Sequence, residues 1–111
     1  LSMGQQNRMN LIRYLIQDFD LLILDESLAN VDEALRETII LAIKEIFPAK
    51  LFLYISHNLM EVARFCKDIL VLSRPGKNKG AVVVPGQNYE TGYTADPQAI
   101  DRSMLEIMNA V

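Results

Sequence analysis

The chain has 111 residues, of which 50% are hydrophobic and 23% are charged, and its formal net charge is -3. This length allows one domain or part of one, and the composition is typical of a globular protein with a hydrophobic core. The acidic balance argues against a nucleic-acid surface, which usually shows clustered Lys and Arg. The single cysteine, Cys66, excludes an internal disulfide and favours a reducing compartment. No apolar run is long enough to span a bilayer.

The first half of the chain predicts helix, strand, helix and strand in turn. Residues 5–17 place apolar side chains at helical spacing, and residues 19–24 form a short apolar run that ends in charge, as buried strands do. A second amphipathic helix is expected over residues 33–47, where Pro48 ends it. Residues 51–55 then predict a second buried strand.

The second half begins with a short helix over residues 59–66 and a strand over residues 69–72. A glycine- and proline-rich turn leads to another strand over residues 81–84, which we expect at a sheet edge. A last helix starts with Asp96 as its N-cap and Pro97 at its first position. Its expected buried stripe consists of Ile100, Met104, Leu105 and Met108.

Strands that alternate with helices predict an α/β fold, with a mostly parallel sheet flanked by helices. In such sheets, ligands bind beyond the carboxyl ends of the strands. Asp25 and Glu26 directly follow one predicted strand, and His57 follows another. We therefore expect these three side chains to meet at one rim of the sheet.

Asp25 and Glu26 suit the hydrolysis of a nucleoside triphosphate. One carboxylate can hold Mg²⁺, and the other can orient or deprotonate a water for attack on the γ-phosphate. His57 can bond a γ-phosphate oxygen or the attacking water. The plain alternative for the carboxylates is a solvated pair at a strand end. The plain alternatives for the histidine are a cap of the next helix and a satisfied polar residue at the sheet rim. No second His or Cys stands at ligand spacing from His57, so metal binding there is disfavoured.

Ser2 and Gly4 precede the first helix, whose N-terminus offers unpaired N–H groups and a partial positive charge. Glycine lets a phosphate approach the backbone closely, and the serine hydroxyl adds a hydrogen bond. The alternative is a capping box, in which Ser2 begins the helix and Gln5 bonds back to it. The G-x-x-x-x-G-K-[ST] phosphate loop is not found in the sequence, which therefore holds only part of such a site.

In combination, these motifs resemble the nucleotide-binding domain of ABC (ATP-binding cassette) ATPases. Residues 1–5 resemble the LSGGQ signature and residues 21–26 the Walker B strand, while residues 27–32 stand at the D-loop and His57 at the switch histidine. The resemblance covers about residues 1 to 73. The pattern departs from the family at Met3, where a glycine is usual, and within the D-loop, which keeps Asp32. Residues 71–76 also resemble a segment of nitrate, sulfonate and taurine importers.

The resemblance implies the C-terminal portion of a P-loop NTPase domain. Its parts would be the signature motif and helix (1–17), a core from Walker B to the switch histidine (18–73), and a C-terminal strand and helix (74–111). The implied catalytic residues are Glu26, as general base, and His57. The implied Mg²⁺ ligand is Asp25. The implied contacts to ATP and across the dimer are made by Ser2, Gly4, Gln5 and Asp32.

The family's partners follow from the same resemblance. ATP is sandwiched between two nucleotide-binding domains, arranged head to tail, whose closure drives a transmembrane permease from the cytoplasmic face. The chain begins inside the signature, so we read it as lacking the N-terminal half that carries Walker A, and we expect it to be inactive alone. The alternatives are an ATPase of DNA repair or chromosome maintenance, which usually has Glu where Gln5 stands, and a non-catalytic interaction module.

Overall fold

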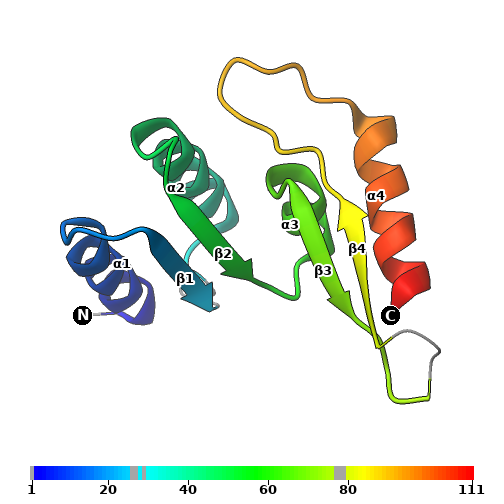
Figure 1. Cartoon of the computed structure of the whole chain (residues 1–111). Helices are drawn as coiled ribbons and strands as arrows, with labels where there is room; N and C mark the ends of the chain where they lie inside the picture. The colour runs from blue at the N-terminus through cyan, green and yellow to red at the C-terminus, as the bar shows by residue number, and fades with distance from the viewer. Residues whose placement is uncertain (1, 26–27, 29, 77–79) are drawn as a thin grey trace. The chain divides into compact units, whose positions relative to one another are not determined.

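The computed structural model describes residues 2–25, 28, 30–76 and 80–111, and it divides the chain into two compact parts, Leu1–Ser56 and His57–Val111. The described elements of the first part are α1 (Met3–Leu15), β1 (Leu21–Asp25), α2 (Glu33–Ile46) and β2 (Leu51–Ile55) (Figure 1). Those of the second part are α3 (Leu59–Phe65), β3 (Asp68–Leu72), β4 (Ala81–Pro85) and α4 (Pro97–Ala110). Each predicted helix and strand is present, with small shifts at its ends.

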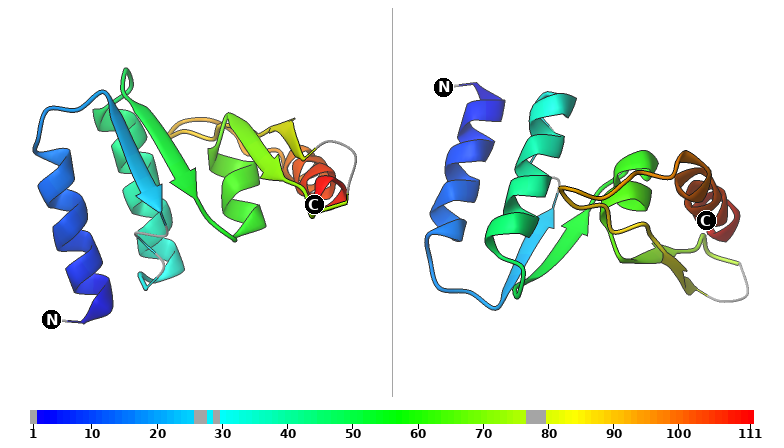
Figure 2. Two further views of the ribbon diagram at one scale, coloured as in Figure 1. Left: turned by 60° about the horizontal axis from the view of Figure 1, so that its bottom comes forward. Right: turned by 90° about the horizontal axis from the view of Figure 1, so that it is seen from above.

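In the first part, β1 and β2 form a parallel pair, in register from Leu21 opposite Leu51 to Asp25 opposite Ile55. Parallel neighbours need a long crossover connection, and α2 provides it. Helices α1 and α2 lie on the same side of the pair (Figure 2). The buried hydrophobic side chains of this part are Leu11, Leu22, Leu24, Leu28, Val31, Ile40 and Ile43.

The opposite face of the β1–β2 pair is apolar and exposed. Because side chains alternate along a strand, those that flank the buried Leu22 and Leu24 point the other way. The exposed fractions on this outer face are Leu21 48%, Ile23 54%, Leu51 65%, Leu53 50% and Ile55 42%. Parallel strands are normally covered on both faces, whereas this outer face is left exposed.

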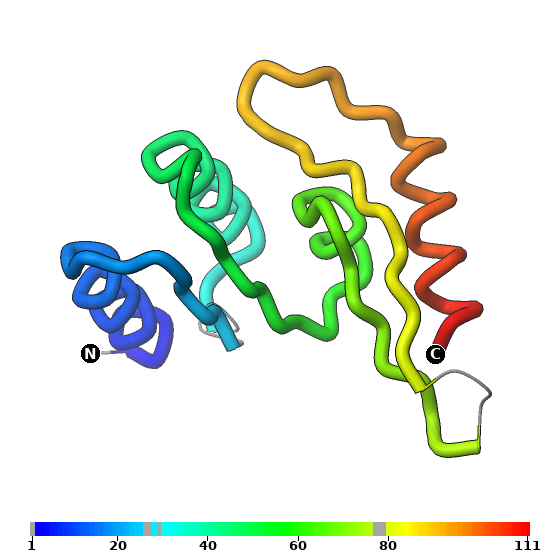
Figure 3. Tube along the Cα trace, in the orientation of Figure 1, coloured from blue at the N-terminus to red at the C-terminus, as the bar shows by residue number. Residues whose placement is uncertain are grey.

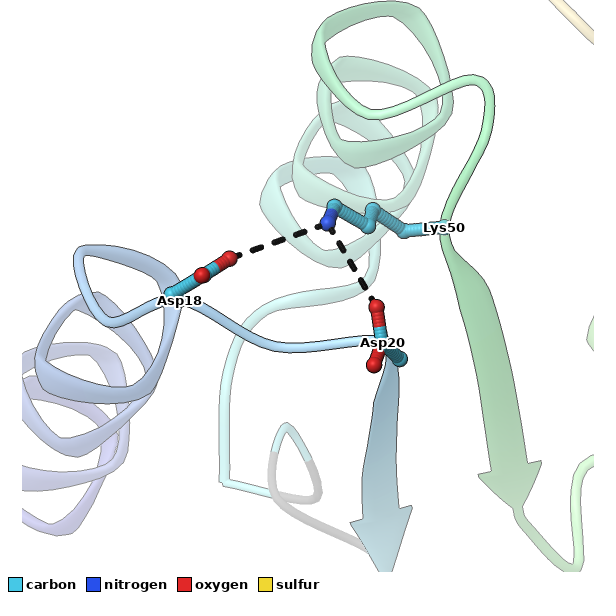
Figure 4. A network of polar contacts seen from close by, with 3 residues as sticks. All are labelled: Asp18, Asp20 and Lys50. Atoms are coloured by element: carbon cyan, nitrogen blue, oxygen red, sulfur yellow. Dashed lines mark ion pairs between the residues drawn. The ribbon is translucent and has the colours of Figure 1, made fainter.

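Lys50 and three aromatic rings pack together at the end of the pair where the chain enters β1 and β2. Lys50 lies between Asp18 and Asp20 (Figure 4), with its Nζ 3.9 and 4.0 Å from their carboxylates. Both carboxylates are fully exposed, so these ion pairs contribute little. The same ammonium lies 5.6 Å from the centre of the Phe19 ring, which belongs to a cluster of three rings. These are the rings of Phe19, Phe47 and Phe52.

In the second part, β3 and β4 form an antiparallel pair, with Asp68 opposite Pro85 and Leu72 opposite Ala81. Our expectation of a mostly parallel sheet is confirmed for β1 and β2 and corrected for the other two described strands, β3 and β4, which pair antiparallel. The reason is the connection between β3 and β4. Residues 73–80 suffice for a hairpin but are too few for the crossover that parallel strands require.

Helix α4 packs against α3, β3 and β4, but only partly through the predicted stripe. Its buried residues are Ala99, Ser103 and Ile107, whereas Leu105 and Met108 are 56% and 57% exposed. The predicted stripe was wrong for Leu105 and Met108, whereas Ile100 and Met104 are half-buried. The buried face is centred on Ala99, Ser103 and Ile107, two of which are small residues that a pattern of large apolar side chains does not reveal. Ser103 is held by hydrogen bonds: its Oγ donates to the Pro85 carbonyl and accepts from Gln87 Nε2, both at 2.9 Å.

Residues 86–96 run between β4 and α4 without helix or strand, as predicted for residues 87–95 (Figure 3). The start of this segment closes the C-terminal end of α3, whose last carbonyls have no partner within the helix. The N–H of Gln87 donates to Ala63 and that of Tyr89 to Arg64, both at 2.8 Å. The Arg64 guanidinium in turn lies 4.6 Å from the centre of the Tyr89 ring.

Replacing Ser103 by Ala should destabilise the second part. The change removes two hydrogen bonds from a site that is 4% exposed, so we expect a loss of about 1–3 kcal/mol in the free energy of unfolding. Urea unfolding followed by circular dichroism measures it. Asn109→Ala, on the exposed side of α4, is the control and should change stability little. Equal stability of the two variants would contradict the role given to Ser103.

Candidate functional site

The start of α1 is a complete capping box. The Ser2 side chain accepts a hydrogen bond from the Gln5 N–H at 3.1 Å, and Gln5 Oε1 accepts one from the Ser2 N–H at 3.0 Å. The predicted alternative, in which Ser2 and Gln5 form a capping box, is therefore confirmed. A hydroxyl that accepts can still donate its own proton, and the N–H groups of Met3 and Gly4 have no partner within a helix. Ser2 and Gln5 are exposed, so the capped end of α1 retains donors for an anion.

Gly4 lies against the chain's own backbone. A Cβ atom built on Gly4 would fall 2.7 Å from the carbonyl oxygen of Asn30. That this glycine lets a phosphate approach the backbone stays a prediction. The direction of its missing side chain is occupied by the backbone of Asn30. Met3, the departure from the signature pattern, has a side chain that is 60% exposed. Position 3 thus has room for a large side chain, whereas position 4 has no room for a Cβ atom.

Asp25 is the last residue of β1 and is exposed. Mg²⁺ is commonly held by one or two carboxylates together with oxygens of the substrate phosphates, and an exposed carboxylate at a strand end fits that use. Among the described residues, no group of three His, Cys, Asp or Glu side chains could hold a metal ion without such help. The chemistry of this position therefore suits an ion that arrives with a nucleotide.

Glu26, predicted as the general base, lies outside the described residues. His57 is exposed and opens the second part of the chain, so its convergence with Asp25 and Glu26 stays a prediction. The alternative reading of His57, as the cap of the next helix, was wrong. Asn58 is the N-cap of α3, and its Oδ1 accepts a hydrogen bond from the Glu61 N–H at 3.1 Å.

Asp32 begins α2 as its N-cap, and its Oδ2 accepts a hydrogen bond from the Leu35 N–H at 3.3 Å. We assigned Asp32 a role only across a dimer and missed this local one. The signal was present, because an Asp directly before a helical stripe is a common N-cap. Asp32 is exposed, so the carboxylate can serve the helix and still be reached from outside.

Buried side chains and hydrogen bonds hold Leu28 and Val31, which precede Asp32, to the first part of the chain. Leu28 is 1% exposed and Val31 is 6% exposed, and the Val31 N–H donates to the Leu28 carbonyl at 3.1 Å. Arg36, on α2, donates from Nη1 to the Val31 carbonyl at 2.9 Å. Sequence reasoning missed this bond, since nothing in the pattern distinguishes Arg36 from an exposed helix residue.

Comparison with curated proteins gives several related chains. The zinc transport system ATP-binding protein TroB of Treponema pallidum is 38% identical over 84 residues, which is 75% of this chain and 32% of that protein. The molybdenum import ATP-binding protein ModC of Saccharophagus degradans is 35% identical over 114 residues, which is 99% of this chain and 30% of that protein. The nickel import ATP-binding protein NikE of Escherichia coli is 38% identical over 74 residues, which is 65% of this chain and 28% of that protein.

The chain thus spans about a third of the length of the curated relatives it matches. No family model matches it, and no solved structure matches it. Over the residues that the structure describes, none of the helices is long and apolar enough to cross a membrane.

Two substitutions at Asp32 should show whether it stabilises α2 through the N-cap hydrogen bond or through its charge. Asp32→Ala removes the cap of α2 and should cost about 0.5–2 kcal/mol of stability, whereas Asp32→Asn keeps an accepting oxygen and should cost much less. Thermal unfolding of both variants measures the difference. If the Asn variant were as unstable as the Ala variant, the carboxylate charge rather than the cap would hold this end of α2.

Proposed function

Since this chain is homologous to the ATP-binding proteins of ABC transporters, we propose that it is part of a subunit that couples ATP hydrolysis to solute transport. In this proposal, it forms the C-terminal half of the nucleotide-binding domain, and an upstream half supplies the Walker A loop. The names of the three relatives mention zinc, molybdenum and nickel. Their common element is the import or transport of a small solute, which is the class of activity proposed here.

The observation that carries the proposal is the parallel pairing of β1 and β2. Asp25 lies opposite Ile55 in the register, so the chain leaves both strands at the same end. Glu26 is the next residue after Asp25, and His57 follows Ile55 after one intervening residue. The carboxyl end of a parallel sheet is where α/β proteins bind ligands, and this pairing supports a ligand role for Asp25 at the end of β1.

In the proposed reaction, the residues of this chain act on the terminal phosphate of ATP. Asp25 helps to hold Mg²⁺, which neutralises charge on the phosphate oxygens. Glu26 takes a proton from the attacking water, and His57 orients that water and the γ-phosphate. The reaction then depends mainly on positioning and on electrostatic stabilisation by groups held in place beforehand.

The start of α1 serves the second nucleotide of a head-to-tail dimer. Ser2, Gly4 and Gln5 face ATP held by the partner domain, with donors supplied by the first turn and by the Ser2 hydroxyl. Support comes from the capping box, which fixes this turn and leaves it exposed. Asp32 carries contacts across the dimer from a loop that is anchored by Leu28 and Arg36.

The outer face of the β1–β2 pair gives the upstream half a place to bind. Its five exposed apolar side chains form the kind of patch that marks a covered surface in the complete protein. The transmembrane permease is a further partner, which places the subunit on the cytoplasmic face of the membrane. Without the upstream half, the chain lacks the phosphate loop and is inactive.

Glu26→Gln should abolish ATP hydrolysis in the chain reconstituted with its upstream half. Loss of a general base typically lowers kcat by about 10²–10⁴-fold, while affinity for an ATP analogue should be kept. Phosphate release and analogue titration measure the two quantities. Glu45→Gln, at an exposed position on α2, is the matched control and should hydrolyse ATP normally. Unchanged hydrolysis in the Glu26 variant would refute the enzymatic role.

The chain on its own should self-associate through the outer face of β1–β2. Leu53 is 50% exposed in the middle of that face, and Leu53→Glu should weaken association about tenfold or more, since a buried Leu contributes about 1.5–3 kcal/mol. Sedimentation equilibrium measures the dissociation constant. Leu105→Glu, on exposed α4 surface, is the control and should leave association unchanged. A monodisperse monomer at all concentrations would contradict this prediction.

A further inference from the structure

Gly4 sits at a contact between two backbones. A Cβ at this position would lie 2.7 Å from the carbonyl oxygen of Asn30, 3.6 Å from its carbonyl carbon and 4.0 Å from the Cα of Val31. Carbon atoms prefer separations of about 3.5–4.0 Å from their neighbours, so any side chain at this position would force the backbones apart. Only glycine allows the first turn of α1 to lie this close to the backbone of Asn30 and Val31.

The loop cannot easily move away from such a clash. Leu28 and Val31 are buried in the core of the first part. Arg36 holds the Val31 carbonyl from α2 at 2.9 Å, and Asp32 is tied to the first turn of α2. The loop is therefore fixed on one side by α2 and its own buried side chains, and on the other side by the backbone at Gly4.

We propose that Gly4 is a positioning residue that fixes Asp32 relative to the first turn of α1. This inference rests on the proposed function, in which the α1 turn faces the nucleotide of the partner domain and Asp32 reaches across the same dimer. A shift of the turn toward Asn30 would displace the Asn30 carbonyl and with it the residues that lead to Asp32.

The competing role for Gly4 is local: its small size would simply admit a phosphate to the backbone. The two roles predict different behaviour. If Gly4 only admits phosphate, its replacement lowers activity independently of Asp32. If Gly4 positions the loop, the replacement disturbs residues 28–32 in the absence of any nucleotide, and its effect on activity overlaps with that of Asp32.

The first experiment uses the 111-residue chain without nucleotide. Amide chemical shifts from ¹⁵N-labelled protein should change at Leu28, Val31 and Asp32 in Gly4→Ala. The matched control is Gly86→Ala, because Gly86 makes a similar close approach to the Cys66 carbonyl in the second part of the chain. Gly86→Ala should disturb residues around Cys66 and leave residues 28–32 unchanged. Shifts at residues 28–32 no larger in Gly4→Ala than in this control would overturn the proposal.

A second variant covers the case in which Gly4→Ala fails to fold. Asn30→Gly gives the loop the freedom to turn its carbonyl aside, so the double variant Gly4→Ala/Asn30→Gly should recover folding that Gly4→Ala has lost. Recovery supports a clash at Asn30. If the double variant is no better folded than Gly4→Ala, the clash lies elsewhere and the proposal fails.

The third experiment measures ATP hydrolysis in the reconstituted protein for Gly4→Ala, Asp32→Asn and the double variant. Independent changes multiply within about twofold. A positioning role instead predicts that the double variant is no slower than the slower single variant, with the loss in kcat rather than in KM. Multiplying effects would overturn the coupling. If the unmodified protein fails to hydrolyse ATP, the proposed function fails, and the chemical shifts still decide whether Gly4 positions the loop.

Discussion

The parallel register of β1 and β2 is the constraint on which the first part of the molecule depends. It sets Asp25 opposite Ile55, and it leaves α2 to cross back over one face of the pair. Of the residues between β1 and α2 that the structure describes, Asn30 and Val31 lie beside the start of α1, and Leu28 and Val31 are buried. Each proposed contact with nucleotide in this part, from Ser2 to Asp32, depends on this arrangement. A change of register by one residue would exchange the buried and exposed faces of the strands.

Local capping and proposed function coincide at Ser2 and Asp32, and the coincidence has a physical cause. A helix start must satisfy its own N–H groups, and the side chains that do so are the same small polar ones that contact phosphates and water. Ser2 and Asp32, which both have a proposed role toward nucleotide or partner, cap helices in this structure. A cap fixes a side chain in one position while leaving it at the surface. The side chain is therefore already ordered when a second partner binds, and binding requires little further loss of its conformational entropy.

Much of this architecture was predictable from hydrophobic periodicity, since each helix and strand is marked by its own spacing. The direction of β4, the inner face of α4 and the environment of Gly4 were not. Each of these depends on a contact between distant segments: a short hairpin, the small side chains Ala99 and Ser103, and the Asn30 carbonyl. Of the site, the capping box of Ser2 and Gln5 was predicted and confirmed. The meeting of Glu26 with His57 stays a prediction.

The difference between positions 3 and 4 bears on how this sequence can drift over generations. Met3 is 60% exposed, so a bulky residue fits at the position where the signature usually has a glycine. Its neighbour has no such freedom, because every other amino acid brings a Cβ to the Asn30 carbonyl. Selection on folding alone would therefore preserve the second glycine, even in a lineage that had stopped binding nucleotide. Retention of that glycine in a sequence is thus no sign by itself of an active ATPase.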